Sequence, residues 1–356
     1  MLNAYNIEDL HSIARERLSS PVYGYFAGGA GDELTLRDNI EAFQRIKIAY
    51  RTMIDISAAS MKTSLLGIDL SMPIILAPTA LHRMAHEEGE IATAKAAAEA
   101  GTLMTLSTIS SVPLEEVAAA APHGKRWFQL YLFNTPEQTE TLIARAEAAG
   151  YGAIVLTADA PILGRRERDL RLGFSLPDGV QAVHFDLVPR STFSPEEPPT
   201  IGAFIHQPDL SWAHLAWIRE RTQLPIILKG IVRGDDAEKA RDAGIAAVWV
   251  SNHGGRQLDT SIATADALPE VVARVGGQLP IIMDGGIRRG TDVLKALAMG
   301  ADAVAVGRAQ LWGLAAGGRD GVALALRMLR DEFAQAMALA GAVTLGDLTP
   351  DLLRRP

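Results

Sequence analysis

The side chains best suited to chemistry stand where short apolar stretches of the chain stop. They combine an imidazole, an ammonium group, carboxylates, a guanidinium group and several hydroxyl and amide groups: Ser107, Gln129, Tyr131, Thr157, Asp159, Lys229, Ser251, Asn252, His253, Asp284 and Arg308. Any one of them could simply be solvated, because a strand end is also where solvent begins. Seven stretches that end in this way instead indicate one shared site, if the stretches are strands whose ends converge.

The segment SNHGGRQLD, residues 251–259, contains a candidate general base. His253 is followed by two glycines and then by Arg256, and a base beside a guanidinium suits the deprotonation of a substrate that carries a carboxylate. Asp159 is expected to face His253, stabilise the imidazolium and so raise the pKa of the histidine. The alternatives are a packed or capping histidine and an aspartate that caps a helix.

A second segment, DGGIRRGTD at residues 284–292, predicts a phosphate site. Its glycines expose backbone N–H groups beside the expected start of a helix, while Arg288 and Arg289 add positive charge. Gly307 and Arg308 follow the next apolar stretch and can serve the same phosphate. Lys229 needs an anionic partner if it is buried, and a Schiff-base lysine is the competing interpretation.

Eight apolar stretches, rich in Val, Ile and Leu, must position these groups. They cover residues 73–78, 103–107, 127–131, 153–159, 225–230, 247–252, 280–286 and 303–308. Continuous hydrophobicity is typical of parallel strands that are covered on both faces. Ala-rich amphipathic stretches separate them, and several end at a glycine suited to a helix C-terminus. The order predicts an α/β fold, a (β/α)8 TIM barrel, with a doubly wound open sheet as the alternative.

The predicted organisation is one domain over residues 1–356. Residues 1–71 form an N-terminal helical extension, and residues 72–340 form the barrel. A stretch at about residues 165–223, after the fourth strand, is too long for an ordinary loop and is interpreted as a mobile lid, irregular over 190–204. Residues 321–341 have the helical periodicity of a last barrel helix.

Composition limits the partners and the chemistry. A net charge of -8 gives no basic surface for nucleic acid or an anionic membrane, and no stretch has the length and hydrophobicity of a membrane span. The absence of cysteine excludes thiolate nucleophiles, disulfides and Cys-ligated metals, and no metal site is predicted. Redox chemistry would therefore need a bound cofactor. The N-terminus is charged where a signal peptide is apolar, which predicts a cytoplasmic protein.

The chain resembles the FMN-dependent L-2-hydroxy-acid oxidases and dehydrogenases, which include glycolate oxidase, lactate oxidase and mandelate dehydrogenase. The resemblance runs nearly end to end, and SNHGGRQLD together with DGGIRRGTD is its most specific part. Further matching segments are VYGYFAGGAGDELTLRDN, SMPIILAPTA, RWFQLY, LTADAPILGRRERD and PIILKGI. The resemblance implies FMN as the cofactor, a small 2-hydroxy acid and O2 as partners, and a homotetramer.

The resemblance also implies a role for each matching site residue. His253 would be the base, with Asp159 as its electrostatic partner, and whether a proton or a hydride leaves first stays open. The substrate groups would be Tyr25, Tyr131, Arg166 and Arg256, with Ile109 in the pocket wall. The cofactor would contact Ala77, Pro78, Thr79, Ala80, Ser107, Gln129, Thr157, Lys229, Ser251, Asp284, Gly286, Arg288, Gly307 and Arg308.

Two positions bear on the reaction. Ile109 stands where glycolate-oxidising members have Trp, and the smaller side chain favours lactate or larger acids over glycolate. Ala80 is the residue that the resemblance links to oxidases, so the expected activity is an (S)-2-hydroxy-acid oxidase that reduces O2 to H2O2. The rivals are a dehydrogenase that uses a quinone or carrier, a non-redox barrel isomerase or lyase, and a binding module without turnover.

Overall fold

A computed structural model describes residues 2–133, 135–187 and 207–355 of the chain. Its centre is a closed barrel of eight parallel strands, joined in the order in which they follow one another along the chain. The strands are β4 (Ile74–Leu76), β5 (Leu103–Leu106), β6 (Lys125–Leu130), β7 (Ile154–Thr157), β8 (Ile226–Ile231), β9 (Ala247–Val250), β10 (Ile281–Met283) and β11 (Ala303–Val306). All eight coincide with the predicted apolar stretches, and β11 pairs with β4 to close the ring. The (β/α)8 barrel is therefore confirmed.

Both faces of the barrel wall are buried, which explains the unbroken hydrophobicity of its strands. Alternate side chains point into the barrel and pack on one another, among them Ile75, Trp127, Val155, Ile227, Trp249 and Ile282. The other side chains of each strand face the surrounding helices and belong to a second, larger apolar cluster. The barrel interior is thus a packed core.

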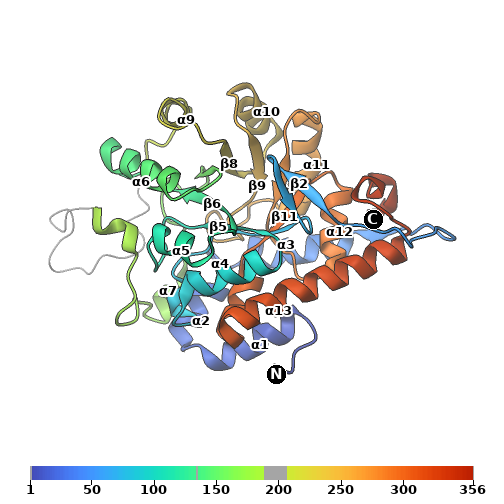
Figure 1. Cartoon of the computed structure of the whole chain (residues 1–356), viewed down its shortest axis with the longest axis horizontal. Helices are drawn as coiled ribbons and strands as arrows, with labels where there is room; N and C mark the ends of the chain where they lie inside the picture. Colours follow the sequence, from blue (N-terminus) through green and yellow to red (C-terminus); the bar gives the residue numbers. More distant parts are fainter. Residues whose placement is uncertain (1, 134, 188–206, 356) are drawn as a thin grey trace.

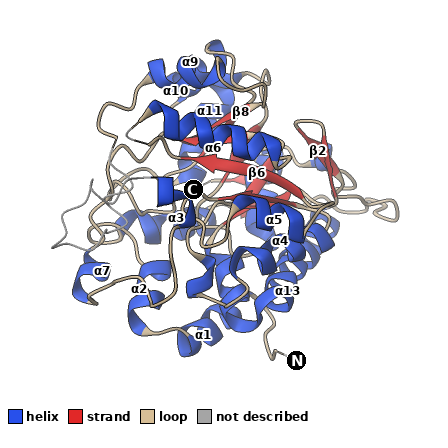
Figure 2. Cartoon of the chain, turned by 60° about the vertical axis from the view of Figure 1, so that its left-hand side comes forward, coloured by secondary structure: helices blue, strands red, loops and turns tan. Residues whose placement is uncertain are grey.

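Helices follow the strands around the outside of the barrel (Figures 1 and 2). They are α4 (Gly89–Glu99), α5 (Leu114–Ala120), α6 (Pro136–Ala148), α9 (Trp212–Arg219), α10 (Gly234–Asp242), α11 (Thr264–Val275), α12 (Gly290–Ala298) and α13 (Arg308–Ala340). The last of them begins earlier than the periodicity over 321–341 indicated, and its course is interrupted at Gly317 and Gly318. No helix of the described ranges has the length and hydrophobicity needed to cross a membrane.

The stretch predicted as a lid is partly regular. After β7 it forms the short helix α7 (Glu167–Arg171), the 3-10 turn η2 (Val183–Leu187) and finally α9, the outer helix of the fourth unit. The predicted lid boundaries therefore include a barrel helix, which loop length alone could not separate from the insertion. The irregular segment expected over 190–204 lies outside the described residues.

The N-terminal extension contains helices and also short strands. Its helices are α1 (Ile7–Arg17), α2 (Ser20–Ala27) and α3 (Leu34–Arg45). Strand β1 (Lys47–Ile48) pairs with β12 (Leu353–Arg354), after the 3-10 turns η4 (Leu345–Asp347) and η5 (Pro350–Leu352). The 3-10 turn η1 (His82–Met84) follows β4. A purely helical extension was therefore too simple a prediction.

A hairpin closes the end of the barrel opposite the strand C-termini. Its strands are β2 (Thr63–Leu65) and β3 (Ile68–Leu70), and Leu65 and Leu70 are buried against the apolar side chains of the barrel interior. Figure 1 shows the hairpin on the right of the barrel, whereas α2 and α7 lie together at the lower left. The extension thus reaches both ends of the barrel.

We predict that the hairpin contributes to the stability of the barrel. Leu70→Ala should lower the free energy of unfolding by about 2–5 kcal/mol, because it removes a buried side chain and leaves a cavity. Asp69→Ala, on the exposed side of the same strand, should change it by less than about 0.5 kcal/mol. Urea unfolding followed by circular dichroism measures both, and equal effects of the two variants would contradict the proposed packing.

Candidate active site

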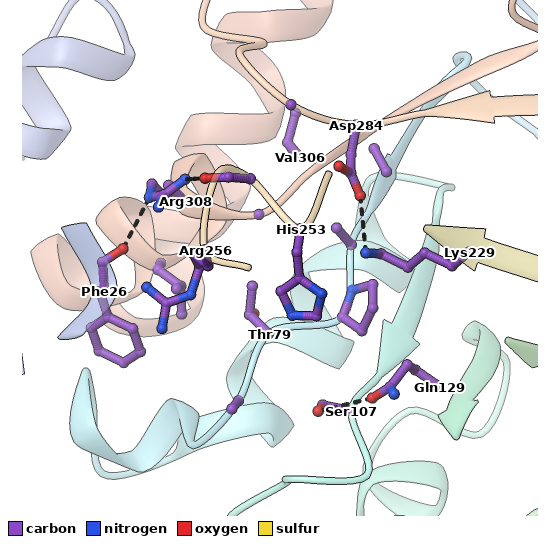
Figure 3. A pocket seen from close by; sticks show the side chains of 18 of the residues that line it. Phe26, Thr79, Ser107, Gln129, Lys229, His253, Arg256, Asp284, Val306 and Arg308 are labelled. Atoms are coloured by element: carbon purple, nitrogen blue, oxygen red, sulfur yellow. Dashed lines mark hydrogen bonds and ion pairs between the residues drawn. The ribbon is translucent and has the colours of Figure 1, made fainter. Parts of the chain in front are cut away.

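A cavity lies at the carboxyl ends of the barrel strands. Nearly all the predicted site residues line it: Tyr25, Ala77, Pro78, Thr79, Ala80, Ser107, Ile109, Gln129, Tyr131, Thr157, Arg166, Lys229, His253, Arg256, Asp284, Gly286, Arg288, Gly307 and Arg308. Asp159 and Ser251 lie behind this lining and contact residues that belong to it. Figure 3 shows His253 between Arg256 and Lys229, with Gln129 and Ser107 on another wall. The convergence expected from the sequence is therefore present.

His253 and Asp159 form a direct pair. The imidazole Nδ1 lies 2.9 Å from Asp159 Oδ1, and both side chains are largely buried. Burial acts to raise the pKa of Asp159, but the interactions of its carboxylate with His253 and Lys229 outweigh burial, so the pKa is lowered and the carboxylate is ionised. Since this carboxylate can only accept a hydrogen bond, the Nδ1 of His253 carries the hydrogen and Nε2 is left as an acceptor.

The expected rise in the pKa of His253 is not what the structure gives. Burial lowers the pKa of this histidine, Asp159 acts to raise it, and Lys229 lowers it further, with a lowered pKa as the result. The sequence predicted the partner correctly but could not include the loss of hydration in the barrel mouth. His253 is therefore neutral at neutral pH, which is the form that general-base catalysis requires.

Two backbone features bring this pair together. His253 adopts a left-handed conformation with φ of 59°, which a residue with a Cβ rarely does and which is often associated with functional sites. Across the pair, Gly230 has φ of 106°, and a Cβ at this position would stand 2.6 Å from Asp159 Cβ. Asp159 can therefore pack against β8 and reach His253 only because residue 230 has no side chain.

Tyr131 reaches the free nitrogen of the base. Its hydroxyl group lies 3.3 Å from His253 Nε2 and can donate to it. Burial raises the pKa of Tyr131, and the charge of Asp159 acts in the same direction, so the phenol keeps its proton. A group bound between Tyr131 and His253 would therefore meet one donor and one acceptor.

A row of hydrogen bonds fixes the polar wall formed by β5, β6 and β7. Gln129 Oε1 accepts from the hydroxyl of Ser107 at 3.2 Å and from the Thr108 backbone at 3.1 Å. Gln129 Nε2 donates to the Thr157 hydroxyl at 3.0 Å. These contacts determine which end of the Gln129 amide is the donor and hold all three side chains in one orientation.

A second row crosses β8, β9 and β10. Lys229 Nζ donates to Ser251 Oγ at 2.9 Å and lies 3.5 Å from Asp284 Oδ2. The Ser251 hydroxyl donates to Asp284 Oδ1 at 2.7 Å and accepts from the backbone N–H of His253 at 3.1 Å. Ser251 therefore holds Lys229 and the backbone of His253, and its contact with a cofactor stays a prediction.

Three residues form a cationic and aromatic wall beside the base. Arg256 donates to the carbonyl groups of Tyr25 and Gly28, and its guanidinium lies 4.8 Å from the centre of the Tyr25 ring. Arg166 is buried, and burial together with the charge of Arg256 lowers its pKa to about 10. At this pKa Arg166 stays charged at neutral pH, and two guanidinium groups side by side suit a carboxylate.

The loops after β10 and β11 form the second cationic region. Gly286 has φ of 82°, and a Cβ there would collide with the backbone oxygen of Asn39 at 1.9 Å. Arg288 and Arg308 line the cavity, and the pKa of each is lowered, chiefly by burial. Arg308 donates to carbonyl groups of Phe26, Gly28 and Gly254, and Figure 3 shows its bond to Phe26. A bound phosphate would offset the charge that these two arginines concentrate.

Arg289 does not share this role. Its guanidinium binds Glu332 of α13 at 2.8 Å, and the residue is exposed. The helix α12 begins at the next residue, so consecutive side chains diverge at its first turn. Of the two adjacent arginines predicted to supply positive charge, only Arg288 lines the cavity.

Sequence reasoning did not include the residues that hold the Ala77–Ala80 segment from behind. His82 Nε2 lies 2.6 Å from the Thr79 hydroxyl, and His82 Nδ1 lies 3.0 Å from Thr93 Oγ1. Gln310 Nε2 donates to the Ala77 carbonyl at 2.7 Å and to Thr79 Oγ1 at 3.1 Å. Gln310 comes just after Arg308, and this position was the one signal available.

The chain matches known proteins over almost its whole length. Residues 14–355 match the family model described as FMN-dependent dehydrogenase. The chain is 46% identical to an L-lactate oxidase of Nostoc sp. over 356 residues, covering 98% of this chain and 97% of that protein. It is 47% identical to glycolate oxidase 1 of Zea mays over 347 residues, covering 97% and 94%.

Solved structures show the same architecture. A crystal structure of mandelate oxidase with (S)-2-phenylpropionate superposes with a TM-score of 0.90 at 40% identity and covers 99% of each chain. A second, with benzoyl-formic acid, gives the same TM-score, identity and coverage. The likeness therefore includes both the barrel and the N-terminal extension.

We predict that Asp159→Asn lowers the pKa of His253 still further. The carboxylate acts to raise that pKa, and its neutral replacement removes the stabilisation of the imidazolium. An NMR titration of the histidine ring signals, assigned with His253→Gln, measures the shift. Asp209→Asn removes an exposed carboxylate outside the cavity and should leave the His253 titration unchanged. A pKa of His253 that rises or stays constant in Asp159→Asn would refute the ion-pair interpretation.

Proposed function

Because this chain belongs to the FMN-dependent dehydrogenase family and its relatives include 2-hydroxy-acid oxidases, we propose a specific oxidase reaction for it. An L-2-hydroxy acid, lactate or a larger acid in preference to glycolate, is oxidised to the 2-oxo acid. The two electrons and two protons removed from the substrate reduce O2 to H2O2. The observation that carries the proposal is a neutral His253, hydrogen-bonded to ionised Asp159 and adjacent to a carboxylate-binding wall.

The substrate side of the site supports this proposal. Arg256 and Arg166, with Tyr25, hold the substrate carboxylate on the cationic wall. The substrate hydroxyl binds beside the Tyr131 hydroxyl and His253 Nε2, which lie 3.3 Å from each other, so that it accepts from Tyr131 and donates to His253. His253 Nε2 takes a proton, and the resulting imidazolium is stabilised by Asp159 through the Nδ1 hydrogen bond.

The remaining lining fits FMN. The cationic region of Gly286, Arg288 and Arg308 would hold its phosphate, with Gly307 beside it. Lys229 and the row of Ser107, Gln129 and Thr157 offer ordered polar groups to the edge of the ring system, and Ala77–Ala80 its back. Asp284 orders Lys229. When bound, FMN supplies the two-electron acceptor that the side chains of this chain lack.

The wall beside the substrate favours lactate or larger acids. Ile109 is buried and lines the cavity after β5, where a tryptophan would occupy more of the volume. Loss of pocket volume of this order discriminates between substrates by about 1–3 kcal/mol. An L-lactate oxidase and mandelate oxidases are among the similar proteins, and so is a glycolate oxidase.

Ala80 supports the choice of oxygen as the electron acceptor. It lines the cavity at the end of the Ala77–Ala80 segment. The family resemblance links Ala at this position to members that use O2 as the electron acceptor. A dehydrogenase that transfers electrons to a quinone or carrier is the second candidate and would share every other residue of the site. The Schiff-base alternative is disfavoured because Lys229 is ion-paired with Asp284 and hydrogen-bonded to Ser251.

We also propose that residues 1–356 act as one domain. Tyr25 and Phe26 of the extension line the cavity together with barrel residues, and the extension accepts hydrogen bonds from Arg256 and Arg308. The cytoplasmic location and the homotetramer stay predictions.

The function is tested with the purified, FMN-loaded protein. Anaerobic addition of L-lactate, glycolate or L-mandelate should bleach the flavin absorbance, and admission of air should restore it with release of H2O2. His253→Gln should stay yellow and be reduced about 10²- to 10⁴-fold more slowly, since it lacks the base. Slow recovery in air would identify a dehydrogenase, and normal bleaching of His253→Gln would exclude the base assignment.

Substrate preference is tested at Ile109. Ile109→Trp should shift the ratio of kcat/KM for glycolate over L-mandelate upward by about 10- to 200-fold, because the larger ring excludes larger acids. Leu339→Trp, an exposed position on α13, is the matched control and should leave the ratio unchanged. An unchanged ratio in Ile109→Trp would show that this wall does not contact the substrate side chain.

A further inference from the structure

A fully buried histidine outside the cavity connects three segments of the chain. His184, in η2, has its Nδ1 2.9 Å from the backbone carbonyl oxygen of Thr108, and the backbone N–H of Leu114 donates to its Nε2 at 3.1 Å. Its ring meets Phe128 edge-on with 5.7 Å between the ring centres. A carbonyl only accepts and an N–H only donates, so the imidazole is neutral with its hydrogen on Nδ1. Burial lowers the pKa of His184, which agrees with this form.

These contacts support the main chain on both sides of Ile109. His184 Nδ1 binds the Thr108 carbonyl, and the backbone N–H of Val183 donates to the Ser110 carbonyl at 3.0 Å. Ile109 itself donates its N–H to Ser107 Oγ at 3.0 Å and accepts at its carbonyl from Leu81 at 2.9 Å. These bonds hold the backbone of Ile109 and so fix the position from which its side chain enters the cavity wall.

Thr108 also links the histidine to the polar wall of the site. Its backbone N–H donates to Gln129 Oε1, and its hydroxyl donates to the Gln129 carbonyl at 2.6 Å while accepting from the Tyr131 backbone. The peptide between Thr108 and Ile109 is therefore held at its N-terminal end by β6. The His184 bond adds the support that comes from the segment after β7.

We propose that His184 is a positioning residue for substrate specificity, and that its Nδ1 bond to Thr108 fixes Ile109 in the wall that receives the substrate's side chain. The inference rests on the proposed function, because Ile109 has this meaning only if the cavity binds a 2-hydroxy acid. His184 acts through the Thr108–Ile109 backbone and does not line the cavity.

The two hydrogen bonds of His184 can be separated by substitution. The Asn amide reaches the position of Nδ1, so His184→Asn can keep the donor to Thr108 and loses the acceptor for Leu114. The longer Gln reaches the position of Nε2, so His184→Gln can keep the acceptor and loses the donor to Thr108. Each variant leaves one buried polar group unpaired, which costs a similar amount of stability.

The experiment compares these variants as FMN-loaded enzymes. The readouts are kcat/KM for L-mandelate and glycolate, the dissociation constants of benzoylformate and glyoxylate, and the Tm. Two ratios express selectivity: kcat/KM for L-mandelate over that for glycolate, and the dissociation constant of glyoxylate over that of benzoylformate. His184→Gln should bring both ratios about tenfold closer to one, whereas His184→Asn should keep them within about threefold of the wild type. Both variants should show a similar fall in Tm.

A double-mutant cycle separates action through Ile109 from a general effect. In an Ile109→Ala background, His184→Gln should no longer change the ratios, because the side chain that it positions is absent. Equal ratios in the wild type, His184→Asn and His184→Gln, or an equal change in the two variants, would overturn the inference and leave His184 with a stabilising role only. If the wild type oxidises none of the acids, the proposed function fails, and this inference fails with it.

Discussion

The burial of positive charge at the barrel mouth is the constraint on which the rest of the site depends. Arg166, Lys229, Arg256, Arg288 and Arg308 all line one cavity, whose carboxylates are fewer. Buried cations must be hydrogen-bonded or paired. Arg256 and Arg308 satisfy this condition largely with backbone carbonyls of residues 25–28, so the N-terminal extension must fold onto the barrel before the site is complete. The remaining excess charge fits a phosphate and a carboxylate.

A neutral histidine in this surrounding is a consequence of the same constraint. Desolvation and the cation Lys229 both disfavour the imidazolium, while Asp159 alone among its principal neighbours favours it. His253 is therefore unprotonated at first, and its imidazolium form is stabilised when negative charge enters the cavity. The substrate carboxylate and the cofactor phosphate would supply such charge, which connects binding to proton transfer.

Much of the architecture could be predicted because its signals are local. Each strand is a continuous apolar stretch, and the polar residue at its end is fixed by the alternation of side chains, so Lys229, Thr157 and Asp284 were placed correctly. Supports that depend on distant segments could not be found in this way. His82 and Gln310 behind Thr79, and His184 behind Ile109, are isolated polar residues in the sequence and gain their roles from partners far along the chain. The hairpin beneath the barrel was missed because its strands have three residues each.

The sequence by itself determined the order of strands and helices through its hydrophobic periodicity, and it indicated the family and its FMN cofactor through the resemblance of specific motifs. The assignment of His253 as the base stays a proposal. Tertiary structure alone decided the direction of the His253 pKa shift, because desolvation depends on everything packed around the imidazole. It also decided between two neighbours of like chemistry. Arg288 lines the cavity and Arg289 binds Glu332, because helix α12 begins at Gly290, directly after them, and their side chains point in different directions. Adjacent residues of one type are equivalent in a sequence, and only the path of the backbone separates them.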